Sequence, residues 1–238
     1  MGKASARKLL QECDQVLLLA RHTGKLAAAQ AELSEFGEVK TVSVDLYDEA
    51  AVDEFIKTVE NESRHIKCLV NSAGYFNPTP FVGHTKKDYD TYHDLNRSTF
   101  FITQAVVANM QKHGGGSIVN IGSMWAKQAI KATPSSAYSM AKAGLHAMTQ
   151  HLAMELADSN IRVNAVAPAV VVTPIYGAFI EPDKIEETLQ GFNGFHPIGR
   201  VGRPCDVAEV VGTLLSDKSG WVTGVVWDVD GGVMAGRN

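Results

Sequence analysis

The sequence predicts an α/β fold in which helices cover both faces of a doubly wound parallel sheet. Short apolar segments alternate with longer helical segments along the 238 residues, and the apolar segments have the composition of strands buried on both faces. No internal repeat and no linker rich in Pro, Gly or Ser divides the chain. We therefore expect one domain over residues 1–238, with right-handed crossovers between its strands.

The predicted strands are apolar runs bounded by turn residues. The clearest is 117–121, which follows a glycine turn and ends at Gly122. A short apolar run without polar alternation is typical of a parallel strand that is covered on both sides. The complete set is 15–20, 39–45, 66–71, 117–121, 161–167 and 225–229.

The predicted helices fill the intervals between these strands. The run from Tyr138 to Ala157 is rich in Ala and Met, contains no proline, and has Gly144 as its only glycine. The complete set is 3–13, 23–35, 48–63, 86–112, 138–158 and 205–215. One long irregular segment, 173–204, is rich in glycine and aromatic residues and contains a short helix at 183–189. We interpret it as a lid over a substrate, and the alternative is a surface excursion; the two interpretations are compatible.

Composition excludes several classes of protein. With 22 Lys and Arg against 26 Asp and Glu, the formal charge is −4, and no basic stripe indicates nucleic acid. The apolar runs are too short to span a membrane. Cys13, Cys68 and Cys205 have no close spacing, which disfavours a disulfide framework or a zinc site and indicates reduced thiols in a cytoplasmic protein. The eight histidines show no metal-ligand pattern, so we expect no metal site.

Candidate catalytic residues lie on the predicted helix 138–158 and after the strand before it. Tyr138 and Lys142 are four positions apart, so they share one helix face. A cation beside a phenol favours the phenolate and lowers its pKa, so that the tyrosine can exchange a proton with a carbonyl oxygen. Ser123 follows the strand 117–121 at the edge of the sheet where ligands of open α/β folds bind.

Further motifs accompany these residues in a fixed order. N-S-A-G occupies 71–74, L-N-R-S occupies 95–98, and V-N-A-V-A-P-A occupies 163–169. With Ser123 and the segment Y-S-M-A-K at 138–142, they make the sequence similar to the short-chain dehydrogenase/reductase family over nearly its whole length. The resemblance implies a Rossmann-like fold and an oxidoreductase that uses NAD(P).

The resemblance also implies catalytic roles. Tyr138 would be the general acid in reduction, and Lys142 would lower its pKa and bind the nicotinamide ribose. Ser123 would orient the carbonyl, and Asn96 would lie at a helix kink whose backbone holds a water in a proton relay to Lys142. Because Ser123 lies slightly further from Tyr138 than is usual in the family, the lesser candidates Ser135 and Ser136 are kept.

The resemblance places the cofactor along the ends of several strands. Ala169 replaces the glycine that usually follows the proline beside the nicotinamide. Arg21, with no acidic neighbour, favours NADP(H) over NAD(H), because a guanidinium attracts a ribose 2′-phosphate; a solvated strand-end charge is the alternative. The implied cofactor residues are Gly2, Arg21, Asp45, Leu46, Asn71, Ala73, Gly74, Tyr138, Lys142, Pro168, Ala169, Val171 and Thr173.

The N-terminus departs from the family pattern. The family opens with a central strand and a glycine-rich turn that binds the pyrophosphate. Here Gly2 matches only the last glycine of that turn, and the strand expected between 15–20 and 66–71 is missing. Two hypotheses follow: Met1 is an internal methionine of a longer chain, or the short form is real and its sheet is repaired. Direct pairing of 15–20 with 66–71 would favour the second.

Two functions from different classes are therefore predicted. The first is NADPH-dependent reduction of a moderately hydrophobic ketone or aldehyde, or the reverse oxidation of a secondary alcohol. The second is a non-catalytic binding or assembly protein on the same scaffold, truncated at its N-terminus. The resemblance implies a homotetramer or homodimer that pairs the helices 86–112 and 138–158, and no nucleic-acid or membrane partner is expected.

Overall fold

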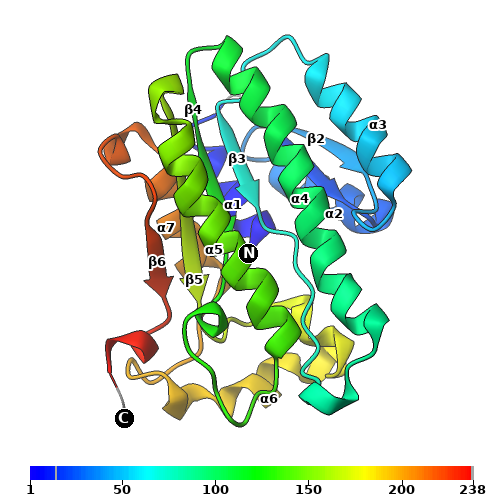
Figure 1. Ribbon diagram of the computed structural model, residues 1–238, viewed down its shortest axis with the longest axis vertical. Coiled ribbons are helices and arrows are strands. Elements are labelled where there is room, and N and C mark those ends of the chain that lie inside the picture. Colours follow the sequence, from blue (N-terminus) through cyan, green and yellow to red (C-terminus); the bar gives the residue numbers. More distant parts are fainter. Residues whose placement is uncertain (14, 237–238) are drawn as a thin grey trace.

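A computed structural model describes residues 1–13 and 15–236 and shows the expected α/β architecture, with parallel strands between layers of helices (Figure 1). The strands are β1 Gln15–Ala20, β2 Glu38–Ser43, β3 Cys68–Asn71, β4 Gly116–Ile121, β5 Ile161–Pro168 and β6 Val226–Val229. The helices are α1 Gly2–Leu9, α2 Thr23–Leu33, α3 Glu49–Glu60, α4 Lys86–Lys112, α5 Ser136–Glu155, α6 Ile185–Gln190 and α7 Pro204–Leu215.

The strands form two parallel sheets rather than one. One sheet contains β1 and β2, and the other has the order β3-β4-β5-β6. Within residues 1–13 and 15–236, no strand pairs with the free edges of β1 and β3. The direct pairing of β1 with β3 that would close the gap does not form. The gap falls where the family resemblance places its missing strand.

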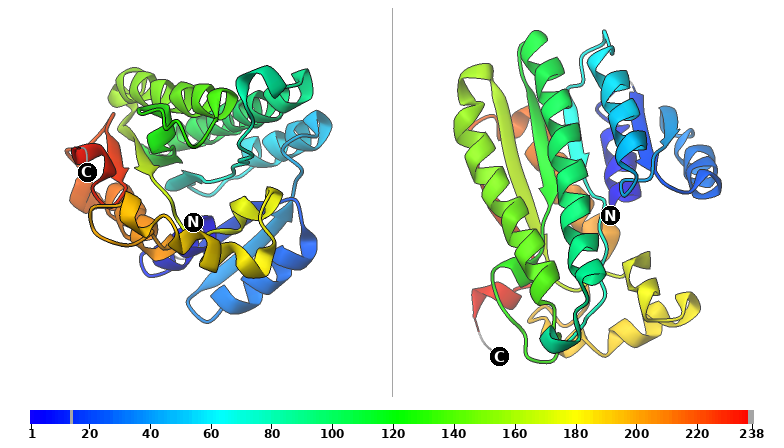
Figure 2. Two further views of the ribbon diagram at one scale, coloured as in Figure 1. Left: turned by 90° about the horizontal axis from the view of Figure 1, so that it is seen from below. Right: turned by 45° about the vertical axis from the view of Figure 1, so that its right-hand side comes forward.

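Helices cover both faces of the four-stranded sheet, as Figure 2 shows from two further directions. On one face, α3, α4 and α5 contribute to an apolar core that includes Ile118 and Val163, both fully buried. On the other face, α1 and α7 pack against Val119 and Val166 of the same two strands, β4 and β5. Because both faces of β4 and β5 are covered, their residues must be apolar on both sides, and this explains the uninterrupted apolar runs in the sequence.

Local signals fix the ends of the two elements that lead to the site. The helix α4 begins at a capping box, in which Thr85 accepts the backbone N–H of Asp88 and the Asp88 carboxylate accepts the backbone N–H of Thr85. After α4, Gly115 has a φ of +127° and passes so close to Asn160 that a Cβ would overlap the Asn160 carbonyl oxygen. This turn directs the chain from α4 into β4, as the glycine run predicted.

Helix ends were predicted less well than strand positions. The first helix ends at Leu9 instead of residue 13, and α5 spans Ser136–Glu155 instead of 138–158. After α5 the chain tightens into a 3-10 turn, and Asn160 then adopts a left-handed conformation with a φ of 56°. In the part of the chain that the structure describes, no helix has both the length and the apolar character needed to cross a membrane.

Candidate active site

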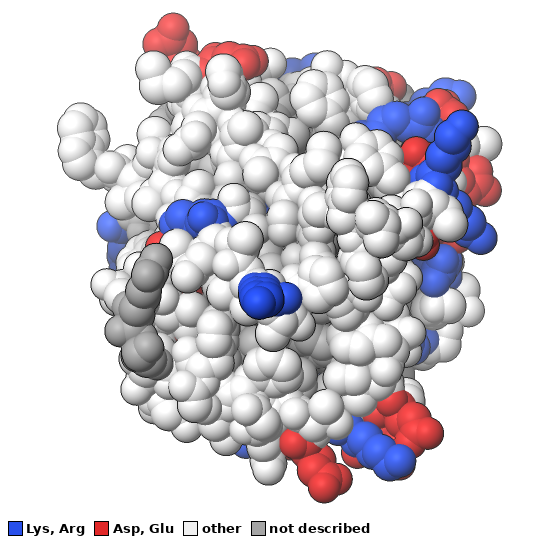
Figure 3. Space-filling view, turned by 60° about the horizontal axis from the view of Figure 1, so that its bottom comes forward, with Lys and Arg blue, Asp and Glu red and all other residues white. Residues whose placement is uncertain are grey.

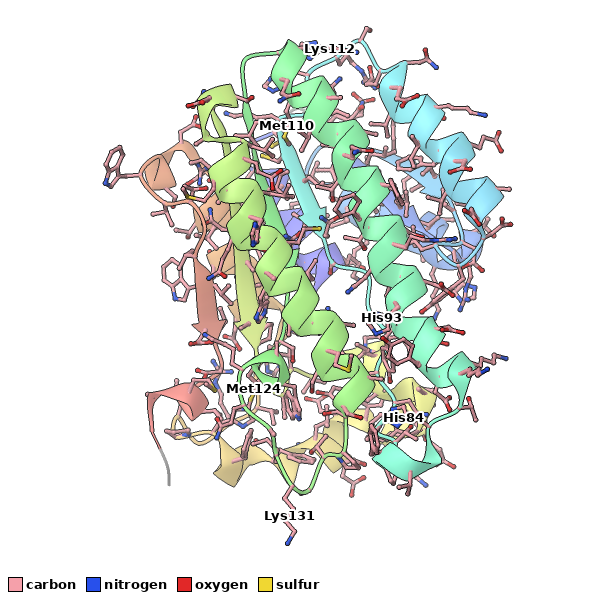
Figure 4. All side chains as sticks on the ribbon, in the orientation of Figure 1. His84, His93, Met110, Lys112, Met124 and Lys131 are labelled. Carbon is pink, nitrogen blue, oxygen red and sulfur yellow. The ribbon has the colours of Figure 1, made fainter. Side chains whose placement is uncertain are left out.

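Tyr138 and Ser123 meet at the carboxyl end of β4. Tyr138 lies in the first turn of α5 and is buried, and its hydroxyl is hydrogen-bonded to Ser123. Ser123 begins the 3-10 turn η2 (Met124–Ala126), and its Oγ accepts the backbone N–H of Trp125 at 3.3 Å. Met124, the residue after Ser123, is labelled near the end of β4 in Figure 4. The predicted pair is therefore assembled in one place.

The pKa of Tyr138 moves in the direction opposite to the predicted one. Burial in an apolar surrounding raises it to about 12, although the hydrogen bond with Ser123 lowers it in part. The Lys142 ammonium lies 5.9 Å from the centre of the Tyr138 ring and donates to the carbonyl oxygen of Ile121 at 2.7 Å. The predicted lowering of this pKa by Lys142 is not seen here, because burial is the largest cause of the shift and the hydrogen bond with Ser123 is what acts against it. Tyr138 is a protonated phenol at neutral pH.

Lys142 is the group whose pKa approaches neutrality. Its burial lowers the pKa of the ammonium to about 8. Its position one turn after Tyr138 on α5 brings it to the same helix face, as the spacing predicted. A lysine with such a pKa exchanges protons readily near neutral pH.

Lys142, Tyr138 and Asn96 line one small cavity. Its volume is about 20 Å³, enough for about one water molecule. The Asn96 amide of α4 donates to the carbonyl oxygen of Ala141 on α5 at 2.7 Å, so it ties the two helices together beside this cavity. Helix α4 runs unbroken through Asn96, and the predicted role of its backbone in holding a water stays a prediction. Asn71, Ala73 and Gly74 line the same cavity.

Tyr138 also lines a second, larger cavity of about 220 Å³. Ser123 and four residues predicted to contact the nicotinamide, Pro168, Ala169, Val171 and Thr173, lie in its wall. The lesser candidates Ser135 and Ser136 line neither cavity, and the Ser135 hydroxyl donates to the carbonyl oxygen of Thr133. The other residues in the wall are Met1, Phe76, Pro78, Gly122, Trp125, Ala132, Thr133, Val170, Ile175, Tyr176, Phe179, Ile180, Leu189 and Phe192.

The remaining predicted cofactor residues lie at the ends of β1 and β2 and at the start of α1. The Arg21 guanidinium is half-exposed and forms an ion pair with Asp45 at 3.6 Å. The carbonyl oxygen of Leu46 accepts the Ser98 hydroxyl at 2.6 Å. Gly2 begins α1, where a Cβ would lie 3.1 Å from the Ser72 hydroxyl.

These residues fit a dinucleotide. The first turn of α1 has no side-chain cap, so its backbone N–H groups are free of side-chain acceptors and suit a pyrophosphate. Arg21 and Asp45 offer a cation and a carboxylate at one edge, and the larger cavity adjoins Tyr138 at the other. Together these are the residues that could hold the pyrophosphate, the adenosine ribose and the nicotinamide of the cofactor.

His146 is a site residue whose contact was not predicted. Its Nε2 accepts the backbone N–H of Ser123 at 3.3 Å, and burial, together with the charges of Lys127 and Lys142, lowers its pKa to about 4. A Cβ on Gly122 would collide with this imidazole, so only glycine fits there. The signal in the sequence was spacing alone, because His146 follows Lys142 by four positions on α5.

Comparison with known proteins identifies the family. A family model described as enoyl-(acyl carrier protein) reductase matches residues 1–234. The 3-oxoacyl-[acyl-carrier-protein] reductase of Thermotoga maritima is 37% identical over 200 residues, which are 83% of this chain and 78% of that protein. The chain belongs to the short-chain dehydrogenase/reductase family.

Other members of the short-chain dehydrogenase/reductase family match it more completely. The 7alpha-hydroxysteroid dehydrogenase of Clostridium sardiniense is 33% identical over 241 residues, covering 99% of this chain and 90% of that protein. The crystal structure of L-sorbose reductase from Gluconobacter frateurii, complexed with NADPH and L-sorbose, superposes with a TM-score of 0.88 at 26% identity, covering 99% and 93% of the two chains. As a short-chain dehydrogenase/reductase, the protein is an NAD(P)-dependent oxidoreductase of carbonyl and alcohol groups.

Proposed function

We propose that this protein reduces a ketone or aldehyde with NADPH, with Tyr138 as the proton donor, and that it can run the reverse oxidation of a secondary alcohol. The observation that carries the proposal is the placement of Tyr138 in the walls of both cavities, hydrogen-bonded to Ser123. Because its pKa is raised to about 12, the phenol is a proton donor rather than a base at neutral pH. A protonated Tyr138 therefore favours reduction, which needs a proton donor, over the reverse oxidation, which needs a proton acceptor.

The residues divide the proton chemistry between them. Ser123 holds the substrate oxygen beside the Tyr138 hydroxyl, which gives its proton to that oxygen as the carbonyl carbon receives the hydride. The products are an alcohol and a phenolate. Lys142, with its pKa near 8, returns a proton to the phenolate through the small cavity beside Asn96. The bound dinucleotide supplies the hydride in reduction and accepts it in oxidation.

The preference for NADPH rests on Arg21. In the proposed complex this guanidinium binds the ribose 2′-phosphate, and the uncapped start of α1 binds the pyrophosphate. The carboxylate of Asp45 competes for Arg21 and opposes the phosphate, which limits the preference. NAD(H) is therefore the weaker alternative cofactor.

The substrate is moderately hydrophobic and enters beneath the segment 173–204, which acts as a lid. This segment supplies Tyr176, Phe179 and Phe192 to the wall of the larger cavity. Figure 3 views the molecule with its lower end brought forward, and on that face charged side chains gather near the rim and leave a broad uncharged centre apart from isolated basic groups. An apolar substrate can approach such a surface without removing water from charged side chains.

Titration with NADPH tests the proposal. Nicotinamide fluorescence is expected to change on binding, and addition of a panel of neutral ketones is expected to oxidise NADPH. The Tyr138→Phe variant is expected to bind NADPH but to reduce the ketones about 10²–10⁴-fold more slowly. A protein that remains folded by circular dichroism and yet leaves the NADPH fluorescence unchanged would contradict the proposal and favour a binding or assembly role.

A further inference from the structure

Three side chains of α5 contact the segment at the end of β4. Tyr138 is hydrogen-bonded to Ser123, and Lys142 donates to the carbonyl oxygen of Ile121 at 2.7 Å. One turn further along the helix, His146 accepts the backbone N–H of Ser123 at Nε2 over 3.3 Å. Residues spaced by four positions lie on one helix face, so His146 continues the row that Tyr138 and Lys142 begin.

The imidazole of His146 packs directly against the backbone before Ser123. A Cβ on Gly122 would collide with the ring, and the Gly122 N–H donates to the carbonyl oxygen of Val166 on β5 at 2.8 Å. Gly122 is therefore enclosed by the ring on one side and by β5 on the other. Removing the ring would open a space beside Gly122, and the backbone could move into it.

The backbone N–H of Ser123 also needs an acceptor. Ser123 is 3% exposed and His146 is 8% exposed, so their contact is buried. A buried N–H that loses its acceptor is costly, and the backbone would shift to reach another one. The hydroxyl of Ser123 would move with its backbone, although this hydroxyl is the group that meets Tyr138.

The surroundings keep the His146 ring in the form that can accept. An imidazole that accepts at Nε2 is neutral and carries its proton on Nδ1. Burial lowers the pKa of His146 to about 4, and the charges of Lys127 and Lys142 act in the same direction. The Asp228 carboxylate acts in the opposite direction, but it is paired with Lys127 at 2.7 Å. The ring is therefore an acceptor at neutral pH.

We propose that His146 is a positioning residue, which fixes the backbone of Ser123 so that the Ser123 and Tyr138 hydroxyls meet the same substrate oxygen. The inference rests on the proposed function, since it assigns a further residue to the same site. His146 is absent from the walls of both cavities, so it acts through Ser123. A misplaced hydroxyl weakens stabilisation of the transition state more than binding of an apolar ketone, so the effect falls on kcat rather than on KM.

Three substitutions at His146 separate the acceptor from the bulk of the side chain. The amide oxygen of Gln can take the place of Nε2, that of Asn lies one methylene short, and Leu fills space without an acceptor. For the ketone that the wild type reduces fastest, His146→Gln is expected to keep kcat close to that of the wild type. His146→Asn and His146→Leu are expected to lower kcat about ten- to a hundredfold and to leave KM nearly unchanged.

Two controls exclude a loss of folded protein. NADPH titration counts the binding sites in each variant, and kcat is expressed per site, so an unfolded fraction does not count as lost activity. His151→Gln, at an exposed position of the same helix, should preserve both kcat and KM.

A measurement on the wild type needs no variant. In NMR of protein labelled with ¹⁵N at histidine, His146 is expected at neutral pH to be an uncharged ring with its proton on Nδ1. A proton on Nε2 would overturn the inference even if every variant failed to fold, because such a ring cannot accept the Ser123 N–H.

Two kinetic outcomes would also overturn it. Equal kcat in His146→Gln and His146→Asn would show that the acceptor does not matter, and an unchanged kcat in His146→Leu would show that Ser123 keeps its place without the ring. Failure of the proposed function looks different, because the wild type would then leave NADPH unoxidised with every ketone, and the positioning role would fall with it.

Discussion

The imidazole of His146 supports the backbone of Ser123, whose N–H it accepts at Nε2 over 3.3 Å. Because this contact uses the neutral ring, protonation of His146 would place two donors against each other. The pKa of His146 in the folded protein is accordingly lowered to about 4 by burial and by the charges of Lys127 and Lys142, against 6.5 ordinarily. The stability of the folded protein and the position of the Ser123 backbone are therefore both expected to depend on the pH.

Stability is expected to fall as the pH decreases from about 6.5 to about 4. In this window the unfolded chain takes up a proton at His146 and the folded protein does not, so the free energy of the unfolded state falls relative to that of the folded state. The contribution of His146 is about 2–3 kcal/mol, fully present above pH 6.5. Urea unfolding at a series of pH values measures it.

Two variants isolate this contribution. His146→Gln keeps an acceptor for the Ser123 N–H and cannot titrate, so it should flatten the pH dependence by the stated amount. His151→Gln removes an exposed histidine of the same helix and should leave the slope unchanged. An unchanged slope in His146→Gln would show that His146 titrates normally in the folded protein.

Replacing Tyr138 by Phe is expected to lower kcat/KM for reduction by about 10²–10⁴-fold, the usual contribution of a positioned general acid. The phenyl ring keeps the edge contact with Phe76, so NADPH affinity and folding should be nearly unchanged. Steady-state kinetics and fluorescence titration measure the two effects. Tyr89→Phe, which removes an exposed hydroxyl from α4, serves as the control and should retain activity. Retained activity in Tyr138→Phe would exclude the assigned role.

The rate of reduction is expected to fall above about pH 8. Lys142 must be protonated to restore the Tyr138 phenol, and its pKa in the folded protein is lowered to about 8. Above this value the rate should decrease about tenfold per pH unit. A plot of log kcat against pH shows this decrease as an alkaline limb. Lys142→Arg keeps a charge at all accessible pH values, so whatever activity it retains should lack the alkaline limb; a limb unchanged in this variant would assign it to another group.

How far these properties were predictable depends on whether their cause is local. The strand 15–20 and the helix 86–112 were predicted residue for residue, and both have local causes, an apolar run in the strand and the capping box that the structure shows at the start of the helix. The proximity of Tyr138, Lys142 and Ser123 was likewise predictable from their spacing and their place after a strand, whereas their roles stay a prediction. The ends of α1 and α5 were missed, since tertiary packing decides where a helix yields to a turn.

The properties that were not predicted arise between distant segments. The pKa of Tyr138 depends on burial by Phe76 and other aromatic residues, and no spacing along α5 reveals that burial. The contact of His146 with Ser123 joins residues 23 positions apart, so it forms only once α5 packs against the end of β4. Burial and satisfaction of hydrogen bonds are properties of the folded whole.

Arg21 and Asp45 are expected to set the choice of cofactor. Arg21→Ala should raise the Kd for NADPH by about tenfold, the effect of losing one charge-assisted hydrogen bond, and change the Kd for NADH little. Asp45→Asn removes the carboxylate that pairs with Arg21 at 3.6 Å, so it should strengthen NADPH binding. Fluorescence titration with both cofactors measures the ratio. Equal effects of Arg21→Ala on both cofactors would exclude a 2′-phosphate contact.

The exposed faces of α4 and α5 are expected to pair in a homotetramer. Phe100 and Phe101 on α4 are each 46% exposed, and Met140 and Met154 on α5 are 55% and 82% exposed. The two helices lie side by side (Figure 1), and association through them would remove these four large apolar side chains from water. Light scattering coupled to size-exclusion chromatography is expected to give a molar mass equal to that of four chains for the wild type. Phe101→Glu would bury a carboxylate in the contact and should yield smaller species, whereas Lys87→Glu, at an exposed position in the first turn of α4, should not. A wild type that elutes as a monomer would instead show that these side chains face solvent and that each site is complete within one chain.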